Sequence, residues 1–65
     1  MNPFKDIQAI KNWANTTFFK VKEDLLQIKK HPEGIFYYFA KENNQWIFKM
    51  TALEPYFFDG EEYVN

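Results

Sequence analysis

Apolar residues near the start of the chain recur at the spacing of a helix. This apolar stripe consists of Ile7, Ile10, Trp13 and Ala14. Their three- and four-residue intervals predict a helix with one face turned inward. Asn2 is suited to the N-cap, Pro3 to the first helical position and Asp6 to the first turn. Asn15 tolerates the left-handed backbone of a helix end, and a threonine at 16–17 would then cap a following helix.

Residues 18–30 fit two different structures. The apolar positions of a helical interpretation are Phe18, Val21, Leu25 and Ile28, at intervals of three and four residues. The cations at 29–31 suit a helix C-terminus, and Pro32 and Gly34 would end it. We favour this second helix. The alternative is a pair of short strands at 19–22 and 26–29, with a turn at 23–24 and a further turn at 31–34.

Two aromatic and β-branched runs, 35–40 and 46–51, predict a β-hairpin. The segment between them contains Asn43 and Asn44, which accept the positive φ angles of a two-residue turn. Such a turn pairs residues whose numbers sum to 87. The expected pairs are Phe39 with Phe48, Tyr37 with Met50, Lys41 with Trp46 and Tyr38 with Lys49.

This register gives the hairpin two faces of different character. The richer apolar face, which we expect to pack on the helices, holds Ile35, Tyr37, Phe39, Trp46, Phe48, Met50 and Ala52. The other face holds Phe36, Tyr38, Ala40 and Ile47 beside Lys49, Thr51, Glu42 and Gln45. Two short helices can cover one face of a hairpin but hardly both. The second face is therefore expected to meet something else.

The segment after Pro55 combines aromatic and acidic residues. It contains Tyr56, Phe57, Phe58 and Tyr63 together with Asp59, Glu61 and Glu62. Since a disordered tail would not need so many aromatics, we expect a strand that pairs at a hairpin edge.

Length and composition restrict the class of protein. A chain of 65 residues has room for one domain, and 22% aromatic residues argue against disorder. No apolar run reaches the roughly 18 residues of a membrane helix, and the N-terminus has no apolar stretch like that of a signal peptide. We therefore expect a soluble, cytoplasmic protein. Abundant Lys, Asn, Ile and Phe without Arg indicate an AT-rich genome.

Charge divides the chain into two parts. Residues 1–50 carry eight lysines and five acidic residues, hence +3, whereas residues 51–65 carry four acidic residues and no base, hence −4. The C-terminal segment therefore either folds back on the lysine-bearing body or projects from it as an acidic, aromatic segment.

Groups that carry catalysis or bind cofactors are scarce. The chain has no Cys, Ser or Arg, and His31 is its only imidazole, so we predict no metal site and no cofactor. The adjacent acidic residues at 23–24 and 61–62 point apart on a helix or strand. Gly34 and Gly60 cannot form a glycine-rich phosphate loop. We expect a protein that is not an enzyme.

Two binding functions remain, beside the alternative of a monomer without a partner whose aromatics all serve core and tail packing. Aromatics beside lysines on a sheet face, or a small winged domain, would suit nucleic acid. The absence of Arg and the acidic C-terminus argue against that alternative. An excess of aromatics over what a small core can hide favours a protein interface and a homodimer.

We therefore expect an α+β domain over residues 1–65, with one or two N-terminal helices packed on an antiparallel hairpin or three-stranded sheet. Its expected function is to bind another protein, as phage- or plasmid-type inhibitors of host proteins do, with a nucleic-acid enzyme as one partner class. The expected contact residues are Phe36, Tyr38, Ile47, Lys49, Tyr56, Phe58, Asp59, Glu61 and Glu62. Phe36, Tyr38 and Ile47 would be the apolar anchors, with Lys49 and Glu42 at the rim, and Asp59, Glu61 and Glu62 would steer the protein toward a basic partner.

Overall fold

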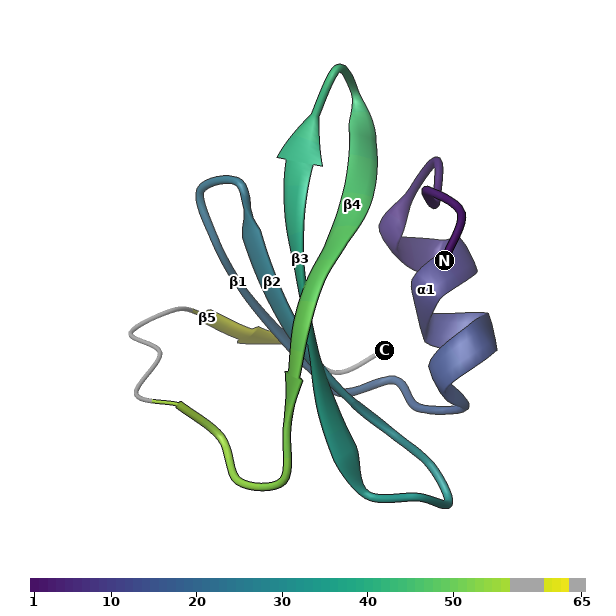
Figure 1. Ribbon diagram of the computed structural model, residues 1–65, viewed down its shortest axis with the longest axis vertical. Coiled ribbons are helices and arrows are strands. Elements are labelled where there is room, and N and C mark those ends of the chain that lie inside the picture. Colours follow the sequence, from purple (N-terminus) through teal and green to yellow (C-terminus); the bar gives the residue numbers. More distant parts are fainter. Residues whose placement is uncertain (57–60, 64–65) are drawn as a thin grey trace.

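The computed structural model describes residues 1–56 and 61–63, with one helix and five strands in this part of the chain (Figure 1). The elements in chain order are α1 (Ile7–Ala14), β1 (Phe19–Lys22), β2 (Leu25–Lys30), β3 (Ile35–Glu42), β4 (Gln45–Ala52) and β5 (Glu61–Tyr63). All strands belong to one antiparallel sheet of order β4-β3-β2-β1-β5. The predicted α+β class with an antiparallel sheet is confirmed, but the expected hairpin or three-stranded sheet was too small, since five strands of the described residues join it. No helix in this part is long and apolar enough to cross a membrane.

Helix α1 begins later than the sequence suggested. Asp6, not Asn2, is its N-cap, and the Asp6 carboxylate accepts a 2.9 Å hydrogen bond from the backbone N–H of Ala9. The start at Asn2 was wrong because Phe4 has extended backbone and exchanges two backbone hydrogen bonds with Trp46. The predicted end is confirmed, since Asn15 adopts the left-handed conformation at φ 57°.

The cap gives a first prediction. Asp6→Ala leaves the orphan N–H of Ala9 without its acceptor, so we expect the free energy of unfolding to fall by about 1 kcal/mol. Asn2→Ala is the matched control and is expected to leave stability unchanged, because Asn2 lies outside the helix. Urea unfolding followed by circular dichroism measures both variants. Equal losses from the two would contradict the observed cap.

The favoured second helix over 18–30 was wrong, and the alternative of two strands is confirmed. β1 and β2 form a hairpin that pairs Phe19 with Ile28 and Val21 with Leu26, and Glu23 in its turn has φ 54°. These paired side chains pack on or within the core beneath α1. The expected cap at 16–17 begins no helix; instead the Thr16 hydroxyl accepts a hydrogen bond from Phe18 N–H.

The β3–β4 hairpin forms with the expected turn, in which Asn43 and Asn44 have φ 53° and 62°. The predicted pairs Phe39–Phe48 and Lys41–Trp46 are confirmed. Beyond them the register shifts by one residue, so Tyr38 opposes Met50 and Tyr37 opposes Thr51. The predicted pairs Tyr37–Met50 and Tyr38–Lys49 were therefore wrong, because a β-bulge inserts one extra residue into β4.

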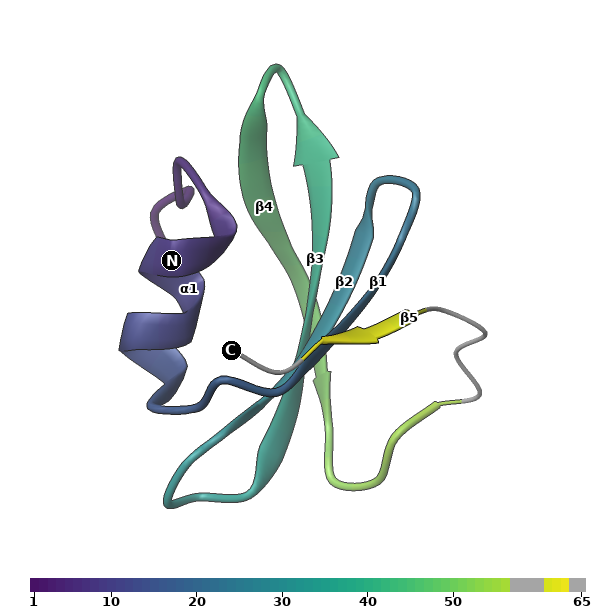
Figure 2. The same cartoon turned by 180° about the vertical axis from the view of Figure 1, so that it is seen from behind.

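The core lies between α1 and one face of the sheet. Its buried apolar residues are Ile10, Ala14, Leu26, Ile28, Phe39 and Trp46. Phe39 is 1% exposed, and the rings of Phe4 and Trp13 lie 5.7 and 6.2 Å from it. This packing places α1 on one side of the twisted sheet, as Figures 1 and 2 both show.

The expected C-terminal edge strand is present as β5, but it does not pair with the β3–β4 hairpin. β2 occupies the free side of β3, and Phe4 pairs with Trp46 at the outer edge of β4. β5 pairs with β1 instead, with Glu62 opposite Lys20 and Glu61 opposite Val21. The acidic end of the chain thus returns to a lysine-bearing strand.

Candidate functional site

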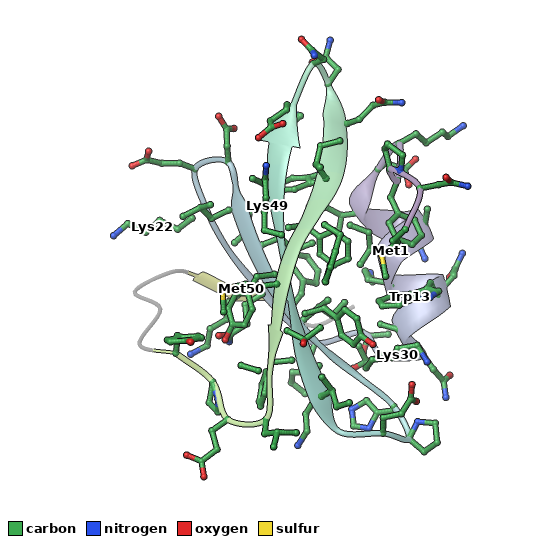
Figure 3. All side chains as sticks on the ribbon, viewed as in Figure 1. Met1, Trp13, Lys22, Lys30, Lys49 and Met50 are labelled. Atoms are coloured by element: carbon green, nitrogen blue, oxygen red, sulfur yellow. The ribbon has the colours of Figure 1, made fainter. Side chains whose placement is uncertain are left out.

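The sheet face turned away from α1, called the far face below, is the candidate binding surface. Strand alternation and cross-strand register place on it Lys20, Lys22, Leu25, Gln27, Lys29, Phe36, Tyr38, Ala40, Ile47, Met50 and Ala52. Figure 3 shows Lys22 and Met50 on the side away from the helix, with Trp13 and Lys30 on the helix side. The far face therefore brings together residues from four strands.

A hydrogen-bonded pair occupies the middle of the far face. The Tyr38 hydroxyl donates a 2.6 Å hydrogen bond to the Gln27 side-chain oxygen, and Gln27 is only 6% exposed. The same hydroxyl accepts a 2.9 Å hydrogen bond from the backbone N–H of Tyr56. The rings of Tyr38 and Tyr56 also meet edge to face at 5.8 Å. Tyr38 thus holds the segment after β4 against the sheet through a hydrogen bond and a ring contact. Tyr38 itself is half-buried.

An apolar cavity of about 250 Å³ opens beside this pair. Its lining residues are Leu25, Leu26, Tyr38, Phe39, Lys49, Met50 and Tyr56. Three of its apolar members are well exposed: Leu25 by 51%, Met50 by 38% and Tyr56 by 60%. Met50 and Ala52 were expected on the helix side, and that assignment was wrong because the bulge transfers both to the far face.

Cations and aromatic rings occupy the other half of the far face. A groove of about 370 Å³ is lined by Thr16, Phe18, Lys20, Gln27, Lys29, His31 and Phe36. The Lys29 ammonium lies 5.5 Å from the centre of the Phe36 ring. Among the described side chains, the salt bridges are Lys30–Glu33 and Lys49–Glu42, so Lys29 has no acidic partner there. The far face is therefore apolar at one end and basic at the other.

The predicted contact residues fall in several environments. Phe36, Tyr38 and Ile47 lie half-buried on the far face. Tyr56 lies against Tyr38. Lys49 forms a 2.8 Å salt bridge with Glu42 beside the cavity that it lines.

The acidic members of that set are only partly placed. Glu61 and Glu62 stand in β5 opposite β1. Phe58 and Asp59 lie outside the described residues.

Leu25, Gln27 and Met50 are far-face residues that sequence reasoning missed. Leu25 and Gln27 were missed because the sequence analysis favoured a helix over 18–30. In the strand interpretation, alternation along 25–30 places them on the opposite face from Leu26 and Ile28. No signal in the sequence marks the bulge that moves Met50.

A second, polar groove of about 930 Å³ lies at the C-terminal end of α1. It is lined by Gln8, Lys11, Asn12, Asn15, Thr16, Thr17 and His31. Lys11 is 5% exposed, and its ammonium lies 5.6 Å from the Phe19 ring.

In the turn after β2, the hydrogen bond from Lys30 holds the pKa of the Glu33 carboxyl below its ordinary value. No described group of three His, Cys, Asp or Glu residues could hold a metal ion.

Comparison of the chain with protein-family models, with curated proteins and with solved structures finds no match. The function is therefore argued from the geometry of the far face.

Proposed function

We propose that this protein is a non-catalytic module that binds another protein through the apolar half of its far face. The observation that carries the proposal is the cavity of about 250 Å³ with Leu25, Met50 and Tyr56 exposed at its rim. Binding sites for small molecules usually enclose roughly 300–1,000 Å³, so this cavity is small for a metabolite. It suits one large apolar side chain, which is how protein interfaces seat their anchor residues.

The surroundings of the cavity support a protein as the occupant. Ile47 and Ala40 continue the apolar surface along β3 and β4, where they pair directly. Contiguous exposed apolar surface on a small domain commonly marks an interface. Tyr56 and Met50 are of residue types enriched at such interfaces. The sequence predicted Phe36, Tyr38 and Ile47 as anchors, whereas the cavity favours a set centred on Tyr38, Tyr56 and Met50.

The wider hypothesis, that the module is a phage- or plasmid-type inhibitor of a host protein, stays a prediction from composition. Its suggested partner class, a nucleic-acid enzyme, has the same status. The expected homodimer also stays a prediction, which sedimentation velocity over a range of protein concentrations checks directly.

Selection from a random peptide library displayed on phage tests the proposed site. We expect the wild-type protein to select peptides with a large apolar residue, and Met50→Glu to lose them because a carboxylate at the cavity rim disfavours apolar insertion. Leu53→Glu is the matched control, since Leu53 is 81% exposed and does not line the cavity. Thermal unfolding checks that both variants remain folded.

Two outcomes would overturn the proposal. One is the absence of any selected peptide whose binding depends on Met50. The other is equal loss of binding in the Met50 and Leu53 variants, which would place the contact elsewhere. A concentration-dependent dimer that Met50→Glu dissociates would identify the occupant as a second copy of the chain and would overturn the assignment to a different protein.

A further inference from the structure

This inference rests on the proposed function and concerns the chemistry of the partner. We infer that the segment bound at the cavity is acidic, with an apolar side chain in the cavity and carboxylates over Lys22 and Lys29. The far face joins an apolar site and, on neighbouring strands, two lysines that make no salt bridge with a described side chain, and a single chain segment can contact both.

The spacing along the sheet fits one short peptide. Lys22 is the cross-strand partner of Leu25, so their Cβ atoms are about 5 Å apart at the edge of the cavity. Lys29 follows Leu25 by four residues on β2, a distance of about 13 Å at roughly 3.3 Å per residue. An extended peptide bridges that distance with about four residues. Carboxylates within about four residues of the apolar anchor would therefore reach both lysines.

Two lysines of the far face, Lys22 and Lys29, are available to bind carboxylates of such a partner. Lys49 is already engaged with Glu42 at 2.8 Å, and Lys30, which lies on the helix side, is engaged with Glu33 at 2.7 Å. Lys22 and Lys29 are exposed and make no salt bridge with any described side chain. Lys20 is set aside because Glu62 stands opposite it in the β1–β5 register. The inference therefore rests on Lys22 and Lys29 alone.

Single-stranded nucleic acid is the competing polyanion, and the far face suits it less well. Phe18 and Phe36 beside Lys29 could accept a stacked base and a phosphate. The cavity lining, however, is mostly apolar, and its one cation, Lys49, is already paired with Glu42, so a phosphate backbone would leave the exposed apolar rim unused. An acidic peptide with an apolar residue uses both halves of the face.

The test uses peptides selected on the intact wild-type protein. We expect them to combine a large apolar residue with nearby Asp or Glu, and we expect a synthetic copy of the most enriched peptide to bind more weakly as salt concentration rises. Lys29→Glu should raise its Kd about fivefold, because an attractive rim charge becomes repulsive. Lys5→Glu reverses an exposed lysine of the N-terminal segment that lines neither cavity of the far face, and it should leave the Kd unchanged. Fluorescence anisotropy measures all three proteins.

Lys22→Glu provides a second reversal should Lys29→Glu lower the melting temperature. Selected peptides that depend on Met50 but lack acidic residues would overturn this inference and leave the proposed function intact. Equal changes in Kd from Lys29→Glu and Lys5→Glu would also overturn this inference and leave the proposed function intact. Binding of an oligo(dT) probe that Lys29→Glu abolishes, with no binding of acidic peptides, would assign the basic half to nucleic acid instead. A selection that yields no peptide whose binding depends on Met50 would overturn the proposed function itself.

Discussion

Phe39→Ala is expected to lower the free energy of unfolding by about 3–5 kcal/mol. Phe39 is 1% exposed, and its ring lies within 6.2 Å of the rings of Phe4, Trp13 and Phe48. Alanine would leave a cavity where three structural units meet: the N-terminal segment, α1 and the sheet. A domain of this length has a total stability of roughly 3–10 kcal/mol, so the variant should be largely unfolded or close to it.

The control for this prediction is Phe18→Ala, the same chemical change at a residue that is 55% exposed. We expect it to change stability by less than about 1 kcal/mol. Urea unfolding followed by Trp fluorescence reports on both variants. Similar losses at the two positions would mean that Phe39 is not the centre of the core.

The β3–β4 hairpin could be predicted because its information is local. Asn43 and Asn44 adopt the positive φ angles that their side chains tolerate, and the flanking runs strongly favour strands. The pairs nearest the turn, such as Phe39–Phe48, follow from turn length alone. One residue of displacement at the bulge then changed every pair beyond it. A bulge depends on how β4 bends around the core. The length of the turn fixes the register next to the turn but does not predict that bend.

Residues 18–30 could not be assigned because their apolar spacing is compatible with two periods. Phe18 and Leu25 supported the helical spacing, yet both are more than half exposed in the structure. Val21 and Ile28 are the positions that face the core. The choice was decided by tertiary structure, since β2 pairs along β3 over six residue pairs. A helix there would have left that edge of β3 unpaired.

The sequence predicted which sheet face carries the candidate site, but it did not predict several of the residues that form it. Phe36 and Tyr38 were placed on the face away from the helix from alternation along β3, and they lie there. Leu25 and Gln27 reach the same face only through the β2–β3 pairing, and Met50 only through the bulge. The cavity is formed by these long-range relations. For that reason the sequence indicated a second apolar face but not the cavity within it.

Tyr38→Phe is expected to lower the free energy of unfolding by about 1–3 kcal/mol, although it removes only one oxygen atom. The Tyr38 hydroxyl donates to Gln27 at 2.6 Å and accepts from the Tyr56 N–H at 2.9 Å. Without it, the oxygen of the buried Gln27 side chain loses its donor, and an unsatisfied buried acceptor costs its full desolvation penalty. Urea unfolding measures the loss, and hydrogen exchange should show faster exchange of the Tyr56 amide.

Tyr37→Phe is the matched control, because no hydrogen bond to the Tyr37 hydroxyl is present in the described part of the chain; we expect a change below about 0.5 kcal/mol. Gln27→Met in the Tyr38→Phe background completes the argument. If the penalty comes from the orphaned Gln27 oxygen, removing that oxygen as well should restore part of the lost stability, because an apolar pair of similar shape needs no partner. Strictly additive losses in this double-mutant cycle would show that the two side chains are not coupled. Slower exchange at Tyr56 in Tyr38→Phe would likewise contradict the role of the hydroxyl in fastening the C-terminal segment to the far face.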